Sequence, residues 1–188
     1  MRVITGKFRS RIIKAPRGVE LRPTADRVKE SLFAILGGFV IDKDCLDLFS
    51  GTGNLGIEAF SRGARSCVFI DANRRCTVAI KENIASLGII EGAQVFCRDA
   101  FRFLKEAEVQ GSSFDLIFLD PPYYNDLIKK ALLTVDSYNI IKAFGIVIAE
   151  HHLKDELPPA DELKRLVLFR QESYGGTILS FYHLKKVD

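Results

Sequence analysis

The sequence predicts an α/β fold, an open and mostly parallel sheet with an antiparallel end, and three observations support it. Short apolar runs alternate with segments of helical apolar spacing along most of the 188-residue chain. Such runs are typical of parallel strands covered on both faces. Near the C-terminus, two strand-like runs are joined through Gly175-Gly176, which indicates an antiparallel hairpin. The composition is 47% hydrophobic, enough for one sizeable core at this length.

The N-terminal part precedes this alternation. Its first residues mix basic and apolar side chains around Gly6-Lys7, which predicts a small β-hairpin with an exposed basic face. A helix is expected to begin after Thr24, a good N-terminal cap, and to end at Gly37-Gly38. We expect one domain over residues 1–188, comprising a basic hairpin (1–20), a leading helix (21–38) and a core (43–188).

Hydrophobic periodicity places the elements of the core. The expected strands are Cys45–Phe49, Ser66–Ile70, Gln94–Cys97, Phe114–Leu119 and Gly145–Ala149. The expected helices between them are Leu55–Arg62, Arg74–Leu87, Ala100–Val109 and Asp126–Val135. The antiparallel strands at the end are Arg165–Ser173 and Thr177–Leu184.

Positive charge is concentrated at the N-terminus. Residues 1–30 hold nine Lys or Arg and three Asp or Glu, a net charge of +6, whereas the remaining chain carries −3. A basic arm of this kind attracts a polyanion and releases its counterions on binding. We expect the arm to contact nucleic acid through Arg2, Lys7, Arg9, Arg11, Lys14 and Arg17. A solvated basic surface that only serves solubility is the alternative.

The cysteines and the apolar runs indicate the compartment. No run approaches the roughly 18 apolar residues of a membrane span, and the N-terminus has no apolar signal core. Cys45, Cys67 and Cys97 lie in apolar runs and are expected to be buried free thiols, as in reducing compartments. The tandem His151-His152 is interpreted as a polar strand end. We expect a cytoplasmic protein with no membrane contact and no bound metal.

A glycine-rich loop follows the first strand of the core and opens a helix. The run from Asp47 to Gly56, DLFSGTGNLG, contains GxGxxG in the context that a nucleotide-binding loop requires. Glycines allow a tight turn and the close approach of a ligand to the backbone. Asp71, at the end of the next strand, can accept hydrogen bonds from both hydroxyls of a ribose. Together they predict an adenosine ligand, the alternative being a glycine-lined turn beside a surface aspartate.

Acidic residues at three strand ends favour one such ligand. Asp47 precedes the glycine loop, where a carboxylate would repel the pyrophosphate of a dinucleotide. S-adenosylmethionine instead carries an ammonium and a sulfonium, which suit a nearby negative charge. Asp99 follows the third strand and can accept a hydrogen bond from the adenine amino group, or cap the next helix. Because ligands bind at this edge of α/β sheets, the three acids predict S-adenosylmethionine as cofactor.

The fourth strand of the core runs into Asp120-Pro121-Pro122-Tyr123. The prolines fix φ and hold the residues before them extended. The Asp120 carboxylate and the Pro121 carbonyl then form a rigid pair of acceptors beside an aromatic ring, Tyr123. This combination fits a planar base with an exocyclic amine, whose hydrogens go to the acceptors while the ring stacks. It predicts methyl transfer to an amino nitrogen, in contrast to a proline-rich turn that merely ends a strand.

These motifs resemble those of class I S-adenosylmethionine-dependent methyltransferases, and Asp120–Tyr123 is similar to the (Asp/Asn)-Pro-Pro-(Tyr/Phe) motif of amino-group methylases. Over nearly its whole length the sequence resembles the RsmD family, which methylates the exocyclic amine of one guanine in bacterial 16S ribosomal RNA. The segments that carry this resemblance are Met1–Gly6, Arg22–Thr24, Arg27–Phe33, Asp47–Gly51, Glu58-Ala59, Ser61–Ala64, Asp120–Tyr123, Tyr174–Thr177 and Leu179–Tyr182.

The resemblance implies a Rossmann-like class I methyltransferase fold with a seven-stranded sheet. It implies that 16S ribosomal RNA, or the assembling small subunit, is the substrate. It implies cofactor contacts at Asp47, Ser50, Gly51, Gly53, Asp71 and Asp99, with Thr24 and Arg27 near the amino-acid end of the cofactor. It implies target-base contacts at Asp120, Pro121 and Tyr123.

Three other functions remain open on the residues alone. The first is an amino-group methylase of DNA adenine or cytosine, or of a protein glutamine, which would use the same acceptor-plus-aromatic motif; the basic arm favours a nucleic acid. The second is a nicotinamide-dependent dehydrogenase, disfavoured by Asp47 and by the lack of a catalytic His or Tyr–Lys arrangement. The third is a non-catalytic RNA-binding module, which would leave Asp120–Tyr123 without a role.

Overall fold

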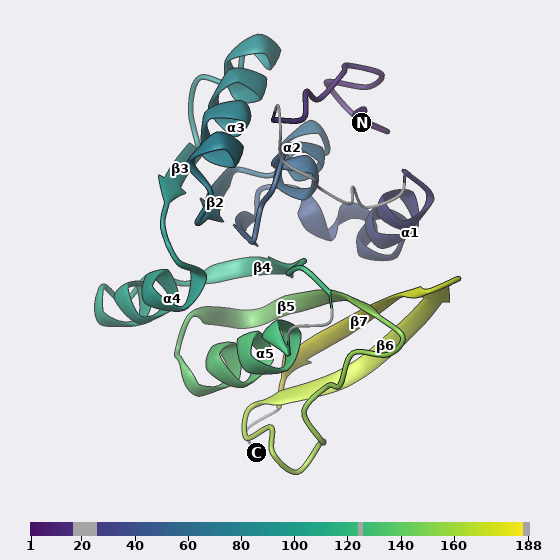
Figure 1. Cartoon of the computed structure of the whole chain (residues 1–188), viewed down its shortest axis with the longest axis vertical. Coiled ribbons are helices and arrows are strands. Elements are labelled where there is room, and N and C mark those ends of the chain that lie inside the picture. The colour runs from purple at the N-terminus through teal and green to yellow at the C-terminus, as the bar shows by residue number, and fades with distance from the viewer. Residues whose placement is uncertain (17–25, 124–125, 186–188) are drawn as a thin grey trace. The chain divides into compact units, whose positions relative to one another are not determined.

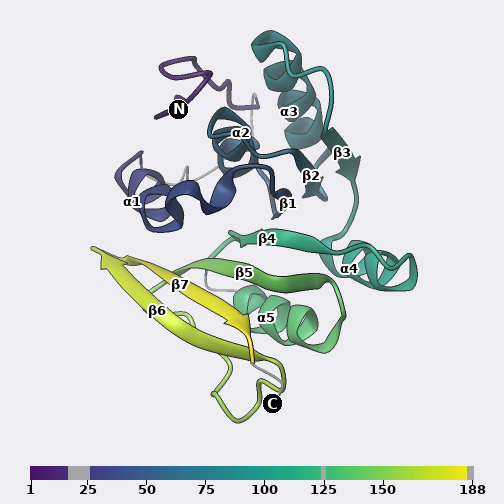
Figure 2. The same cartoon turned by 180° about the vertical axis from the view of Figure 1, so that it is seen from behind.

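The computed structural model describes residues 1–16, 26–123 and 126–185, and the chain forms two compact units, Met1–Asp99 and Ala100–Asp188. Figures 1 and 2 show the chain from opposite sides. The expected helix cap Thr24 and the arm residue Arg17 lie outside the described residues.

The first unit contains three parallel strands and their connecting helices, which can be followed in Figures 1 and 2. Its elements are α1 (Asp26–Leu36), the 3-10 helix η1 (Gly37–Val40), β1 (Asp44–Leu48), α2 (Asn54–Ser61), β2 (Ser66–Asp71), α3 (Arg74–Leu87) and β3 (Ala93–Cys97). β2 pairs with both β1 and β3 in parallel. Helix α2 packs against β1 and β2, and α3 packs against β2 and β3. The carboxyl ends of the three strands therefore meet at one edge, where the glycine loop, Asp71 and Asp99 follow.

The second unit combines a parallel strand pair with an antiparallel end. Its elements are α4 (Ala100–Val109), β4 (Phe114–Leu119), α5 (Leu127–Ser137), β5 (Ile141–His152), β6 (Leu166–Tyr174) and β7 (Thr177–Leu184). β4 pairs with β5 in parallel, whereas β7 pairs antiparallel with both β5 and β6. Strands β6 and β7 form the expected C-terminal hairpin, and α5 packs against β5.

These elements confirm the predicted Rossmann-like α/β class, with seven strands over the described residues. The N-terminal hairpin is present as a single antiparallel bridge between Arg2 and Ile12. Among the described residues, no helix is long and apolar enough to cross a membrane.

Two local features differ from the sequence-based expectation. Strand β5 runs from Ile141 to His152 and is longer than predicted at both ends. It begins before an irregularity at Phe144, whose φ is +65°, and its last three residues pair with β7. His151 and His152 are therefore part of the strand. The prediction that Cys97 is buried is wrong: its side chain is exposed, since β3 pairs with β2 alone among the described strands.

Candidate active site

The glycine loop turns sharply between β1 and α2. Phe49, Gly51 and Gly53 all have positive φ, at 65°, 55° and 76°. This left-handed region is readily accessible to glycine and strained for a residue such as Phe49. Gly56, in the first turns of α2, allows close helix–strand packing, because a Cβ there would lie 2.3 Å from Cε1 of Phe69 on β2.

Asp47 connects β1 to the helix beyond the loop. Its side chain is buried, and Oδ2 accepts a hydrogen bond of 2.9 Å from the backbone N–H of Gly56. The carboxylate therefore holds the two ends of the glycine loop together. Asp47 lies in β1, directly before the loop, as the sequence indicates, and its contact to the cofactor stays a prediction.

Ser50 fastens the loop to β2. Its Oγ lies 2.5 Å from the carbonyl oxygen of Asp47 and accepts a 2.9 Å hydrogen bond from the N–H of Ile70. The Ser50 N–H donates to the carbonyl of Ile70, also at 2.9 Å. The buried Ser50 hydroxyl thus acts as a support of the loop through these protein contacts.

Asp71 is the last residue of β2, lies beside the glycine loop and is half-buried. Its Oδ2 accepts from the N–H of Gly51 at 2.8 Å, and its Oδ1 accepts from the N–H of Asn73 at 2.7 Å. Burial raises the pKa of the Asp71 carboxyl above its ordinary value of 3.8, although these two hydrogen bonds oppose the shift. The predicted ribose acceptor is therefore hydrogen-bonded directly to the glycine loop, at Gly51.

Two further predicted cofactor residues that the structure describes, Arg27 and Asp99, are exposed. Asp99 lies between β3 and α4, two residues beyond Cys97, which pairs with Asp71 in the sheet register. Arg27 lies in the first turn of α1. Hydrogen bonds thus join Asp47 and Asp71 to the glycine loop, and Asp99 lies just beyond the end of the neighbouring strand.

In the second unit, the Asp-Pro-Pro-Tyr segment directly follows β4. Asp120 and Tyr123 are half-buried, and Pro121 between them is buried. The Tyr123 hydroxyl donates to Oε1 of Glu150 at 3.2 Å and lies 3.3 Å from Oγ1 of Thr177. Glu150 is only 4% exposed. The phenol oxygen is therefore anchored inside the unit, which restricts how the ring can turn.

The sequence analysis missed this anchor. Glu150 ends a run of apolar residues in β5, and an acid in such a run signals a buried carboxylate with a polar partner. Thr177 comes close because β7 pairs with β5, where His152 and Thr177 face each other in the register. The His152 ring also lies against Tyr123, with ring centroids 5.7 Å apart. No local pattern in the sequence indicates these three contacts together.

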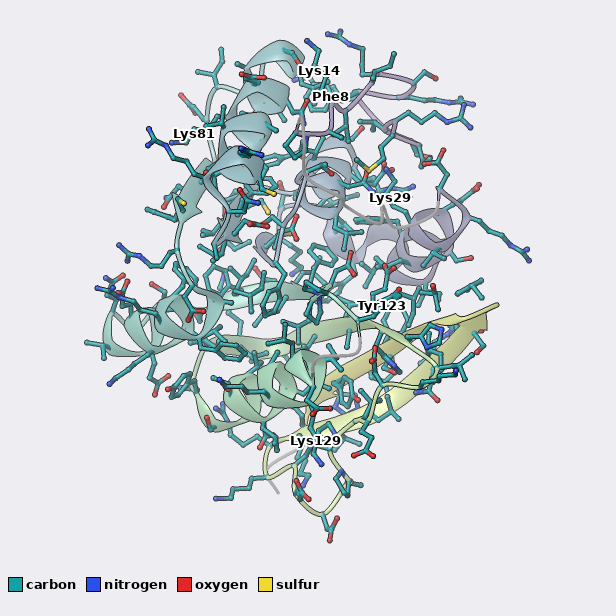
Figure 3. All side chains as sticks on the ribbon, viewed as in Figure 1. Phe8, Lys14, Lys29, Lys81, Tyr123 and Lys129 are labelled. Carbon is teal, nitrogen blue, oxygen red and sulfur yellow. The ribbon has the colours of Figure 1, made fainter. Side chains whose placement is uncertain are left out.

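The basic arm is folded onto α2. Phe8, labelled in Figure 3, is buried together with Val3 and Ile13. Gly6 has a φ of +87° and approaches α2 so closely that a Cβ would meet the carbonyl oxygen of Ser61. The apolar side chains of the arm thus face the first unit. Its cationic side chains are exposed at Arg2, Lys7, Arg9, Arg11 and Lys14.

Comparisons with known proteins find relatives that align with most of the length of this chain. The family model described as conserved hypothetical protein 95 matches residues 1–183. YlbH of Bacillus subtilis (strain 168), provisionally named an rRNA methyltransferase, is 41% identical over 182 residues, covering 97% of this chain and 98% of that protein. Ribosomal RNA small subunit methyltransferase D of Escherichia coli (strain K12) is 32% identical over 158 residues, covering 84% of this chain and 78% of that protein.

A solved structure agrees with the sequence relatives. The yhhF protein of Escherichia coli, provisionally named a methyltransferase, matches this chain with a TM-score of 0.84 and 29% sequence identity. The match covers 98% of each chain. It therefore extends over both compact units.

Proposed function

The chain belongs to the RsmD family of methyltransferases, and from this premise we propose that it methylates the exocyclic N2 amine of a guanine in small-subunit (16S) ribosomal RNA, with S-adenosylmethionine as donor. The substrate is the RNA itself or the assembling small subunit, in the cytoplasm. The observation that carries this proposal is the Asp120–Tyr123 segment, whose aromatic ring is held by Glu150.

The first unit is the proposed cofactor site. Asp71 is half-buried and already oriented by two backbone N–H groups, so its carboxylate suits the hydroxyls of a ribose. Asp47 supplies negative charge behind the loop, and Asp99 is proposed to accept from the adenine amine. Gly51 and Gly53 keep the backbone open to close approach. These acceptor carboxylates beside a glycine-lined loop therefore fit the hydroxyls, the amine and the cationic groups of S-adenosylmethionine.

Thr24 and Arg27 complete the proposed cofactor set at its amino-acid end, and Ser50 keeps the loop in place. When bound, S-adenosylmethionine supplies an activated methyl group on a sulfonium whose departure leaves a neutral thioether. A carboxylate close to a sulfonium and an ammonium is electrostatically favourable in a site of low effective dielectric.

The second unit is the proposed acceptor site. The Asp120 carboxylate and the Pro121 carbonyl each accept a hydrogen bond from the guanine amine, and the base stacks on the Tyr123 ring. Fixing both hydrogens directs the nitrogen lone pair toward the methyl group. Asp120 need not be a strong base, because the amine proton becomes acidic only as the N–C bond forms, and it then passes to the Asp120 carboxylate. Such orientation can contribute on the order of 7–11 kcal/mol to lowering a barrier.

The basic arm is the proposed contact to the RNA backbone. Its five described cations are exposed, and its buried apolar residues hold it against the body, so little ordering entropy is lost on binding. Neutralising Arg9, Arg11 and Lys14 together is expected to weaken RNA binding and to flatten its salt dependence. An unchanged affinity and salt slope would contradict this role.

The test is the transfer of labelled methyl from S-adenosylmethionine to unmodified small subunits, to the same RNA stripped of protein, and to duplex DNA. Wild type is compared with Asp120→Ala, with the conservative Asp120→Asn, and with Asp161→Ala as an exposed aspartate control. We expect label as N2-methylguanine in the RNA, reduced roughly 100-fold or more in Asp120→Ala and unchanged in Asp161→Ala. Calorimetric titration with S-adenosylmethionine checks that each variant still binds cofactor. Label only in DNA, or none despite cofactor binding, would overturn the proposed substrate.

A further inference from the structure

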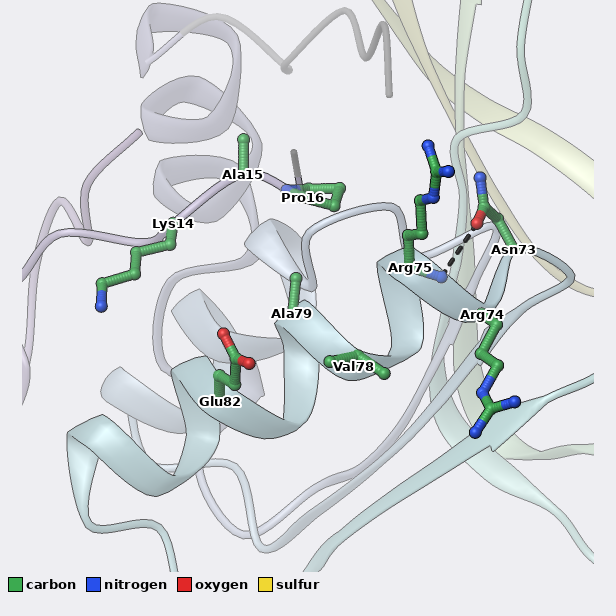
Figure 4. Close-up of a pocket in the computed structure, with 9 residues that line it drawn as sticks. All are labelled: Lys14, Ala15, Pro16, Asn73, Arg74, Arg75, Val78, Ala79 and Glu82. Atoms are coloured by element: carbon green, nitrogen blue, oxygen red, sulfur yellow. Dashed lines mark hydrogen bonds between the residues drawn. The ribbon is translucent and has the colours of Figure 1, made fainter. Parts of the chain in front are cut away.

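An open pocket of about 1090 Å³ lies in the first unit between the end of the basic arm and helix α3 (Figure 4). Its described lining includes Lys14 and Pro16 from the arm and Arg74, Arg75, Val78 and Glu82 from α3. None of the described lining residues belongs to the cofactor or target-base sets above. The cofactor and the target base therefore do not explain this pocket.

The walls of this pocket are fixed to each other. Asn83 of α3, which is 1% exposed, accepts from the N–H of Lys14 at 2.9 Å and donates Nδ2 to the Lys14 carbonyl at 3.0 Å. Further along the same helix, the Arg11 guanidinium donates to the carbonyl of Ser86 at 2.8 Å. Residues 11–14 are thus hydrogen-bonded to α3 at both ends of the segment, at Arg11 and at Lys14. The pocket is consequently formed before any ligand arrives.

The charge of the pocket is positive and spread out. Lys14, Arg74 and Arg75 provide three exposed cations against one acid, Glu82. Figure 4 shows Lys14 at one end of the lining and the two arginines at the other, with apolar side chains between them. Val78, part of that apolar floor, is 46% exposed. Such separated cations do not converge on one phosphate, but they match an anion that extends along the pocket.

We propose that this pocket is an RNA subsite that binds the phosphodiester backbone of the methylated RNA, with Arg74 and Arg75 as its previously unassigned phosphate contacts. The apolar floor then packs against a ribose or a base, while the cations at the ends contact successive phosphates. This inference rests on the proposed function, because it takes the RNA substrate as the extended anion. It adds the start of α3 to the RNA surface that the sequence placed on the arm alone.

The test measures binding of small-subunit RNA stripped of protein as a function of salt concentration. The test variant is Arg74→Gln/Arg75→Gln, and the matched control is Arg102→Gln/Lys105→Gln, which removes two exposed charges from α4. Each lost phosphate contact lowers the slope of log K against log salt by roughly 0.7 to 0.9. We expect a slope reduced by roughly 1.4 to 1.8 and, if the lines meet at 1 M salt, a roughly 25- to 60-fold weaker affinity at 0.1 M. The control is expected to retain the wild-type slope.

The outcomes separate this inference from the proposed function. If the wild type methylates the RNA but the α3 variant binds it like the control, the subsite is wrong and the methyltransferase assignment stands. If the α3 variant loses RNA affinity but methyl transfer goes to another acceptor, Arg74 and Arg75 contact RNA, but the proposed substrate is wrong and so is the assignment of the pocket to the methylated RNA. If the wild type binds no RNA, both are wrong. Unchanged affinity for S-adenosylmethionine in the α3 variant shows that its fold is intact.

Discussion

Nζ of Lys29 on α1 lies 3.4 Å from Oε2 of Glu58 on α2, and both side chains are fully buried. The lysine also donates to the carbonyl of Arg2 at 2.7 Å and to Oδ1 of Asn54 at 2.6 Å. Glu58 in turn accepts from the N–H of Ile4 at 2.8 Å. One buried ion pair therefore joins the arm, α1 and the helix that follows the glycine loop.

Replacing Lys29 by Met is expected to destabilise the protein strongly. The substitution leaves Glu58 buried without its lysine, and breaking a buried pair by removing one partner costs about 3–5 kcal/mol. Arg62, which also pairs with Glu58 at 2.8 Å, should keep the loss near the lower end of that range. Urea unfolding followed by circular dichroism measures it, with Lys81→Met on the exposed face of α3 as control. A loss no larger than that of the control would mean that the pair adds nothing to stability.

Gly56→Ala is expected to lower the free energy of unfolding by about 1–3 kcal/mol, as overpacking in a core typically does. The added methyl would lie 2.3 Å from Phe69 Cε1 and 2.7 Å from Cys67 Sγ, so α2 must move away from β2. Since Gly56 also donates to Asp47, the shift would distort the glycine loop and weaken cofactor binding. Gly38→Ala is the control, because a Cβ there meets nothing within 4 Å. Equal stability and equal cofactor affinity for the two variants would refute the packing argument.

The alternating core could be predicted from the sequence because its elements are local patterns. Helix α3 was expected at Arg74–Leu87 and has those bounds, and β2 ends one residue beyond its expected end. A buried parallel strand appears as a short apolar run whatever lies around it. The glycine loop was equally visible, since its turn depends on residues within a few positions of one another.

Features that depend on distant partners could not be predicted in this way. The extension of β5 requires Phe144 to adopt a positive φ, which its side chain does not indicate. The Tyr123–Glu150 contact depends on where β5 lies relative to the Asp-Pro-Pro-Tyr segment. The pocket between the basic arm and α3 depends on the hydrogen bond between Asn83 and Lys14, which are 69 residues apart in the sequence. In each case tertiary pairing, and not periodicity, decides the position of the side chain.

Comparing Tyr123→Phe with Tyr123→Ala is expected to distinguish the contribution of the aromatic ring from that of its hydroxyl. Phenylalanine keeps the stacking surface and loses the hydroxyl contacts to Glu150 and Thr177, each worth about 0.5–1.5 kcal/mol in stability. Alanine also removes stacking, worth about 1–3 kcal/mol per base, so KM for RNA should rise roughly 5- to 150-fold. Initial rates over a range of RNA concentrations, together with thermal unfolding of both variants, measure the two effects. Equal loss of activity in both variants would assign the function to the hydroxyl instead.

Stability is expected to fall on mild acidification because of His151. Burial lowers the pKa of this histidine below its ordinary value of 6.5, although the neighbouring His152 carbonyl and Asp155 oppose the shift. Its Nε2 lies 2.9 Å from the Ser180 hydroxyl, and its side chain is 3% exposed. Between its folded pKa and 6.5, the unfolded chain therefore binds a proton that the folded chain does not.

By linkage, the free energy of unfolding then rises with pH across that window. As the pH falls below 6.5, the free energy of unfolding decreases by up to about 1.4 kcal/mol per pH unit. His151→Gln keeps a polar partner for Ser180 and removes the titration. Urea unfolding of wild type and variant at pH 7.5, 6.0 and 5.0 should show wild type losing more stability than the variant on acidification. Parallel pH profiles for the two proteins would mean that His151 is not the group responsible.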